Sequence, residues 1–222
     1  KMRGQIKGLH MATKNSQDGI SMIQTAEGAL QETHGIIQRM RELAVQSAND
    51  TNTGEDREKL QLEIDQLVAE IDRVGNTTEF NTRVLMNGEY KDKGTTYHIG
   101  ANKDQNVNLT FADMRSEALG LKGIQILDNP QANEAILTIN NALEEVSNER
   151  AKYGAMQNRL EHTINNLRVS EENLQAAESR IRDTDMASEM VKLNKDKIIS
   201  QSGTAMLAQA NTTPQNVLQL LR

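Results

Sequence analysis

Histidine and acidic side chains are the residues of this chain that could hold a catalytic metal or move protons. The histidines are His10, His34, His98 and His162, and none has a second histidine at the HExxH spacing that puts two imidazoles and a glutamate on one helix face. The closest approach is Glu161-His162, but adjacent side chains point to different faces of a helix. We interpret the histidines as solvated positions rather than metal ligands.

Other residue types that support catalysis or phosphate binding are equally poorly placed. Gly94 and Gly100 do not form a phosphate loop, because no Lys-Ser/Thr pair follows at the required spacing. The acidic pairs at 144–145 and 171–172 lie on predicted helices, where such residues commonly solubilise a face. Cysteine is absent, which removes thiolate nucleophiles and zinc–cysteine sites. We therefore expect no enzyme and no cofactor, and a hydrolase is the least favoured function.

The composition favours a helical protein with few options for a cofactor pocket. Only 2% of the 222 residues are aromatic, tryptophan is absent and proline occurs twice, so aromatic walls for a flat cofactor are scarce. The net charge is −6, with acids and bases interleaved, which argues against a nucleic-acid partner. No apolar run approaches the roughly 20 residues that span a bilayer, so we expect no membrane insertion.

Three long segments with helical periodicity must position the remaining residues. Apolar side chains recur at steps of three and four from Ile6 to Ala48, and a polar turn at 49–54 ends this helix. A second helix carries Leu60, Ile64, Leu67, Ile71 and Val74 at coiled-coil spacing and is expected to fold back antiparallel. A third helix begins near Pro130, with an apolar ladder at 136, 139, 143, 146, 153, 160, 164, 167, 174 and 181.

Two further segments depart from this helical pattern. Between Phe80 and Gly123, the run 95–99 precedes an alternation of Val107, Leu109 and Phe111 with polar residues, which predicts a β-hairpin with one buried face. The run 182–185 then breaks the third helix and starts a last helical arm. The arm carries Met186, Met190, Leu193, Ile198, Ile199, Met206, Leu207, Val217, Leu220 and Leu221. Because nothing in the chain would cover these side chains, they predict an intermolecular partner or a segment missing from the beginning of the chain.

The predicted fold is mainly α, a long antiparallel helical bundle or coiled-coil rod with a small β-hairpin region. Its predicted parts are N-terminal rod helices at 1–78, the hairpin region and connection at 79–129, a C-terminal rod helix at 130–181 and a helical arm at 182–222. The helical pattern is already running at Lys1, without a capping residue, so we expect a preceding helical segment to be missing.

Several blocks of sequence, in order along the chain, resemble bacterial flagellin. They are QDGISMIQTAEGAL at 17–30, RMRELAVQSA at 39–48, EFN at 79–81, NRLEHTINNL at 158–167, AESRIRD at 177–183 and PQNVLQLLR at 214–222. The resemblance implies a structural subunit of the flagellar filament that serves motility. Flagellins open with a further helical segment that pairs with the C-terminal arm, and many carry variable outer domains that the short middle region here lacks. A hook-filament junction protein and a cytoplasmic coiled-coil adaptor remain alternatives.

The resemblance also implies partners and a location. Export through the flagellar type III route, without a cleavable leader, takes the protein from a transient cytoplasmic stage to the extracellular flagellum. The partners implied are other flagellin subunits, an export chaperone on the C-terminal arm from about Met186 to Arg222, and a flagellin-binding regulator whose contact residues cannot be placed.

An innate immune receptor is the last partner that the resemblance implies. Toll-like receptors that sense flagellin engage the rod, at positions that correspond here to Arg39, Leu43 and Glu63, with Gln38 and Gln46 nearby. An arginine beside a leucine anchor suits a binding hot spot. The alternative interpretation is that Arg39 and Glu63 form an ordinary surface ion pair between antiparallel helices.

Overall fold

The computed structural model describes the backbone of residues 1–220 and the side chains of residues 1–212. The chain divides into two compact units, a rod unit (Lys1–Gln175) and an arm unit (Ala176–Arg222). The elements follow in the order α1 (Met2–Ser47), α2 (Gly54–Thr77), β1 (Glu79–Phe80), β2 (Arg83–Val84), α3 (Tyr90–Lys93), β3 (Thr95–His98), β4 (Asn106–Leu109), α4 (Asn129–Arg182) and α5 (Met186–Leu220). The predicted mainly α fold is confirmed.

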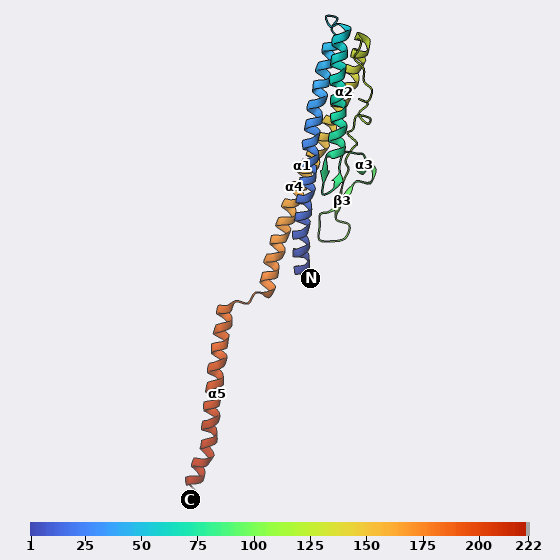
Figure 1. Ribbon diagram of the computed structural model, residues 1–222. Coiled ribbons are helices and arrows are strands. Elements are labelled where there is room, and N and C mark those ends of the chain that lie inside the picture. The colour runs from blue at the N-terminus through green and yellow to red at the C-terminus, as the bar shows by residue number, and fades with distance from the viewer. Residues whose placement is uncertain (221–222) are drawn as a thin grey trace. The chain divides into compact units, whose positions relative to one another are not determined.

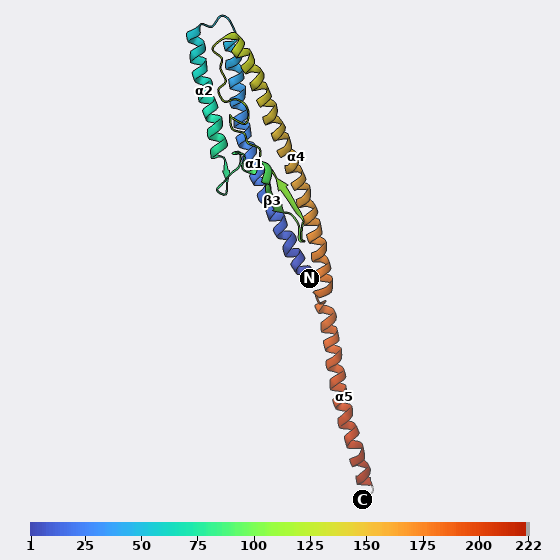
Figure 2. The same cartoon turned by 90° about the vertical axis from the view of Figure 1, so that its right-hand side faces the viewer.

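The rod unit is built around α1, which runs between α2 and α4 (Figures 1 and 2). α4 is antiparallel to α1, because its partners on α1 move toward the N-terminus as α4 proceeds. Arg41 Nε donates to Asn140 Oδ1 over 2.8 Å near the start of α4, whereas His10 Nδ1 lies 3.6 Å from Glu171 Oε1 near the end of the unit. The predicted antiparallel arrangement of the long helices is thereby confirmed.

The core follows the apolar periodicity of the helices. Ile37, Met40 and Ala44 of α1 are fully buried, as is Ile64 of α2. The ladder of α4 is buried or half-buried from 136 to 174, whereas Ile181 is 74% exposed. The ladder therefore serves the rod core over most of its length and leaves its last apolar member uncovered.

A capping box fixes the start of α2. The Thr53 hydroxyl oxygen accepts from the backbone N–H of Asp56, and the Asp56 carboxylate accepts from both the backbone N–H and the hydroxyl of Thr53. These hydrogen bonds, first of all that from the Thr53 hydroxyl, lower the pKa of Asp56. Arg57 Nε donates to the Ser47 carbonyl over 3.0 Å and holds the end of α1 against the start of α2.

The predicted β-hairpin is present as β3 and β4. The two strands pair antiparallel, with Thr95 opposite Leu109 and His98 opposite Asn106, and the alternation buries Val107 and Leu109. Phe111 is also fully buried, but it lies beyond the strand. One face of the hairpin thus joins the core, as the sequence predicts.

Two small elements were not predicted. β1 and β2 form a hairpin whose turn residues, Asn81 and Thr82, have φ angles of 50° and 65°. Two-residue turns of this hand usually contain an Asn-Gly or Asp-Gly pair, so Asn-Thr gave a weak signal. α3 is a single turn of helix and is too short for periodicity to detect.

Polar side chains of α2 fasten the irregular connection between β4 and α4. Asp72 accepts from the Ser116 backbone N–H and hydroxyl, both over 2.8 Å. Gln61 donates to the Ile124 carbonyl over 2.9 Å and accepts from the Ile126 backbone N–H over 2.8 Å. The connection is therefore a fixed layer of the rod unit, because its buried backbone groups find partners on α2.

Two neighbouring side chains on α2 give a matched test of this packing. Ile64 is fully buried, whereas Leu62 is 66% exposed. We expect Ile64→Ala to lower the free energy of unfolding by about 2–5 kcal/mol and Leu62→Ala to change it by no more than about 0.5 kcal/mol. Urea denaturation monitored by circular dichroism measures both values. Equal losses would contradict the assignment of Ile64 to the core.

The capping box gives a test with a defined pH dependence. We expect Thr53→Ala to remove the N-cap and destabilise the rod unit by about 1 kcal/mol at pH 7, with Thr51→Ala as the control. The part of this difference that depends on the Asp56 carboxylate is complete above its unfolded pKa, because the folded state holds the pKa of Asp56 below the unfolded value. It is lost as the pH falls through the folded pKa, so the difference between wild type and variant should narrow below about pH 4. A difference that stays constant down to pH 2 would contradict the box.

Candidate functional site

The arm unit presents an uncovered apolar helix. Asp185 begins α5, because its carboxylate accepts from the backbone N–H groups of Ala187 and Ser188, over 3.0 and 3.2 Å. From Met186 to 212 every described side chain is exposed. The large apolar ones are Met186, Met190, Val191, Leu193, Ile198, Ile199, Met206 and Leu207, with exposures from 45% to 68%.

The apolar side chains of α5 are spread around the helix rather than along one stripe. Positions 186, 190 and 193 share one side, the pair 191 and 198 a second, and the pair 199 and 206 a third, because helical side chains align at steps of three, four and seven. A helix with apolar residues on all sides is normally buried. This arrangement suits contact with several neighbours at once.

The sequence predicted this surface with one omission. Seven of its predicted residues, from Met186 to Leu207, are exposed, and Val191, at 68% exposure, was missed. Val191 lies on the same side of α5 as the predicted Ile198, so the spacing of seven residues between them is the signal that could have found it. The side chains of Val217 and Leu220, and all of Leu221, lie outside the described residues.

A second candidate surface lies on the rod unit, where α1 faces α2. Arg39 Nε donates to Glu63 Oε1 over 2.9 Å, and Arg39 Nη1 donates to Glu42 Oε2 over 3.0 Å. The hydrogen bond with Glu63 is the main cause of the raised pKa of Arg39. Gln38 and Gln46 are exposed on the same helix. The structure therefore brings four of the five predicted receptor residues to accessible positions.

The fifth predicted receptor residue, Leu43, is not at an accessible position, which corrects the prediction. Its side chain is only 1% exposed and belongs to the core of the rod unit. The reason is periodicity, since Leu43 lies three residues after Met40 and four before Ser47, both of which are buried. Leu43 is thus not an accessible anchor, and the exposed large apolar side chain nearest to it along α1 is Val45, at 50%.

The described residues provide no cluster of three His, Asp or Glu side chains that could hold a metal ion. His10 and His162 are exposed on helices, whereas His98 lies on β3 and His34 is half-buried, with its Nε2 3.0 Å from Gln38 Nε2.

Among residues 1–220, no helix is both long enough and apolar enough to pass through a membrane.

Comparison with known proteins agrees with this arrangement. Residues 1–91 match the bacterial flagellin N-terminal helical region, and residues 136–221 match the bacterial flagellin C-terminal helical region. The flagellin of Bacillus subtilis (strain 168) is 51% identical over 255 residues, covering 100% of this chain and 84% of the relative. The flagellin of Halalkalibacterium halodurans is 53% identical over 224 residues, covering 100% of this chain and 82% of the relative.

A solved structure supports the same conclusion. The crystal structure of Bacillus cereus flagellin superposes with a TM-score of 0.60 at 27% identity, covering 82% of this chain and 94% of the other. The flagellins that this chain resembles are structural proteins. About half of the residues are identical to theirs, and the match covers the whole chain. The chain therefore belongs to the bacterial flagellin family and is a structural subunit of the flagellar filament.

Proposed function

We propose that this subunit polymerises through α5, whose apolar side chains become buried between copies in the filament. The observation that carries the proposal is the exposure of every described α5 side chain, together with apolar residues on all sides of the helix. Covering each large apolar side chain contributes about 1–2 kcal/mol. Eight such residues give a gross gain on the order of 10 kcal/mol, comparable to the roughly 4–15 kcal/mol that association costs.

An export chaperone on the arm fits the same chemistry. Before assembly, an apolar helix in water is an aggregation hazard, and a partner that covers α5 removes it. We infer that a flagellar chaperone binds the arm from Met186 onward during a transient cytoplasmic stage, before type III export to the cell exterior. A flagellin-binding regulator is a further partner of this stage. The exposed methionines Met186, Met190 and Met206 suit a surface that packs against more than one partner.

The rod surface around Arg39 is the second proposed binding site, for a Toll-like receptor. Arg39 presents a guanidinium that is already aligned by Glu63 and Glu42, so little side-chain freedom is lost when it binds. Gln38 and Gln46 add exposed donors and acceptors. Val45 takes the place of Leu43 as the exposed apolar contact, while Leu43 acts beneath the surface through packing.

Assembly through α5 is tested by seeded filament growth. We expect Ile198→Ala to raise the critical concentration for growth about tenfold, because it removes apolar area buried between copies. Asn194→Ala, on the same helix, should leave growth unchanged. Electron microscopy and sedimentation measure the filament fraction, and circular dichroism checks that the rod unit stays folded. Normal growth of the Ile198→Ala protein would exclude a role for this side of α5.

The receptor surface is tested by signalling in reporter cells. We expect Arg39→Ala to reduce potency by at least about tenfold with unchanged thermal stability. Arg73→Ala is the matched control, since Arg73 forms a similar exposed pair with Glu70 on α2.

The same assay separates contact from packing. Leu43→Ala should lower both signalling and melting temperature because its side chain is buried, whereas Val45→Ala should lower signalling alone. If Arg39→Ala and Arg73→Ala signal alike, the assignment of the surface is wrong.

A further inference from the structure

A cleft in the rod unit lies between the end of β4 and one face of α4. It has a volume of about 360 Å³ and is lined by Leu109, Thr110 and Phe111 from the strand side. Its other lining residues are Ile23 of α1 and Glu149, Lys152, Tyr153, Ala155, Met156 and Arg159 of α4. The proposed assembly and receptor surfaces do not include any of these residues.

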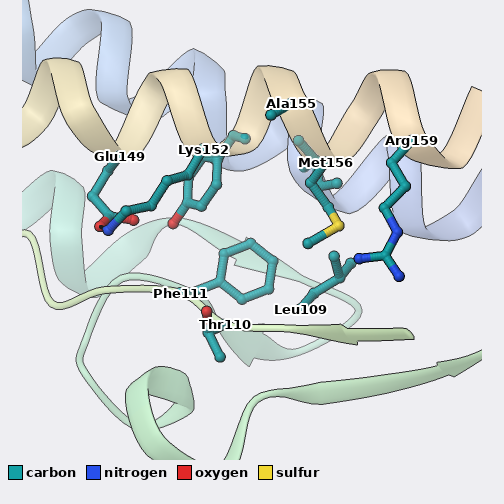
Figure 3. Close-up of a pocket in the computed structure, with 10 residues that line it drawn as sticks. Leu109, Thr110, Phe111, Glu149, Lys152, Ala155, Met156 and Arg159 are labelled. Carbon is teal, nitrogen blue, oxygen red and sulfur yellow. Dashed lines mark hydrogen bonds and ion pairs between the residues drawn. The ribbon is translucent and has the colours of Figure 1, made fainter. Parts of the chain in front are cut away.

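The middle of the cleft is apolar and partly aromatic. Phe111 is fully buried and Tyr153 is 4% exposed, and their ring centroids lie 5.6 Å apart at a tilt of 57°. Met156 and Leu109 lie farther along the cleft, toward Arg159 (Figure 3). A volume above 300 Å³ with mainly apolar walls and few polar groups is typical of small-molecule sites.

One end of the cleft carries an uncompensated positive charge. At the other end Lys152 forms an ion pair with Glu149, so these two charges cancel. Arg159 makes no ion pair and no side-chain hydrogen bond with any described residue, and its side chain reaches toward Leu109 (Figure 3). A guanidinium beside an apolar surface is a suitable partner for a carboxylate, which it can bind through two hydrogen bonds.

The wall of the cleft also offers a hydrogen-bond donor. The Tyr153 hydroxyl is buried and its proton has no acceptor among the described residues. The backbone N–H of Ala112 approaches the same oxygen, but an amide N–H can only donate. Burial is the main cause of the raised pKa of Tyr153, so the hydroxyl keeps its proton. A buried donor without an acceptor is costly, and a ligand oxygen would satisfy it.

We propose that this cleft binds a small amphipathic carboxylate, with its carboxylate on Arg159, its apolar body over Met156 and Phe111, and a second oxygen at Tyr153. Tyr153 and Arg159 are six residues apart on α4, a rise of about 9 Å, which suits an extended chain of medium length. The proposal does not depend on α5 or on the Arg39 surface.

Methyl NMR titration of the full chain tests the site. The probes are octanoate, the neutral 1-octanol and the cationic octyltrimethylammonium, and the reporters are the methyl groups of Ile23, Leu109 and Met156. We expect saturable shifts at all three reporters, with octanoate binding about tenfold more tightly than the cation. A further probe, 8-hydroxyoctanoate, should bind more tightly than octanoate, because its hydroxyl oxygen can accept from Tyr153.

Four variants assign the contacts. Arg159→Gln should weaken octanoate about fivefold and abolish its advantage over 1-octanol. Tyr153→Phe should remove the advantage of 8-hydroxyoctanoate over octanoate while leaving octanoate itself bound. Ala155→Trp, at an exposed position on the cleft wall, should fill the cleft and remove the saturable shifts. Arg168→Gln, at an exposed position of α4 that does not line the cleft, is the control and should bind as the wild type does.

Three other results of the titration can be told apart from the expected one, and each would overturn the proposal. Shifts confined to Met186 and Met190 would mean that the probes merely adsorb to the apolar arm. Shifts of Ile23, Leu109 and Met156 that follow protein concentration without any probe would identify the cleft as a seat for a second copy. Unsaturable shifts, or equal octanoate affinity in Arg159→Gln, would exclude carboxylate recognition.

Discussion

The rod unit depends on the burial of one apolar stripe on α1. α2, α4 and the β3–β4 hairpin all pack on this helix, and the side chains that they cover, such as Met22, Leu30 and Ile37, are fully buried. Because all three of these elements share one core with the stripe, a change in the stripe would affect several interfaces together. The polar contacts between α1 and α4, such as Arg41 with Asn140, lie at the margins of this packing.

The connection between β4 and α4 shows how a chain segment without regular structure can belong to this core. Its apolar residues Met114, Leu121 and Ile126 are buried, which brings backbone groups into an apolar environment where each needs a partner. Gln61 and Asp72 of α2 supply those partners. Gln61 and Asp72 are therefore part of the structural framework, although α2 otherwise has the pattern of an amphipathic surface helix. They satisfy backbone groups of the connection that lie outside any helix or strand.

The sequence predicts well what repeats and poorly what occurs once. The helices, their antiparallel order, the break at 183–185 and the β3–β4 hairpin follow from periodicity and breaker residues. The hydrogen bonds that Gln61 and Asp72 make with the connection cannot be predicted in this way. Each joins residues far apart in the chain, and one partner is a backbone group, which has no sequence signature.

The candidate sites divide in the same way. The resemblance placed Leu43 with Arg39 as a surface contact. The spacing of three residues from Met40, however, already predicts that the Leu43 side chain is buried. The cleft at Arg159 had no signal at all, because its lining residues come from three elements and become neighbours only in the fold.

The rod unit and the arm unit differ in how their apolar side chains are covered. Along α4, the apolar ladder is buried at Leu167, half-buried at Leu174 and 74% exposed at Ile181, so the chain changes from satisfied to unsatisfied apolar surface before the helix breaks. In the rod, most large apolar residues lie on one side of each helix and the chain itself covers them, with exceptions such as Leu62. On α5 they lie on all sides, and no single covering helix could reach them. The rod therefore covers most of its apolar surface within the chain, and the uncovered surface of α5 is the reason for proposing that copies of the subunit assemble through it.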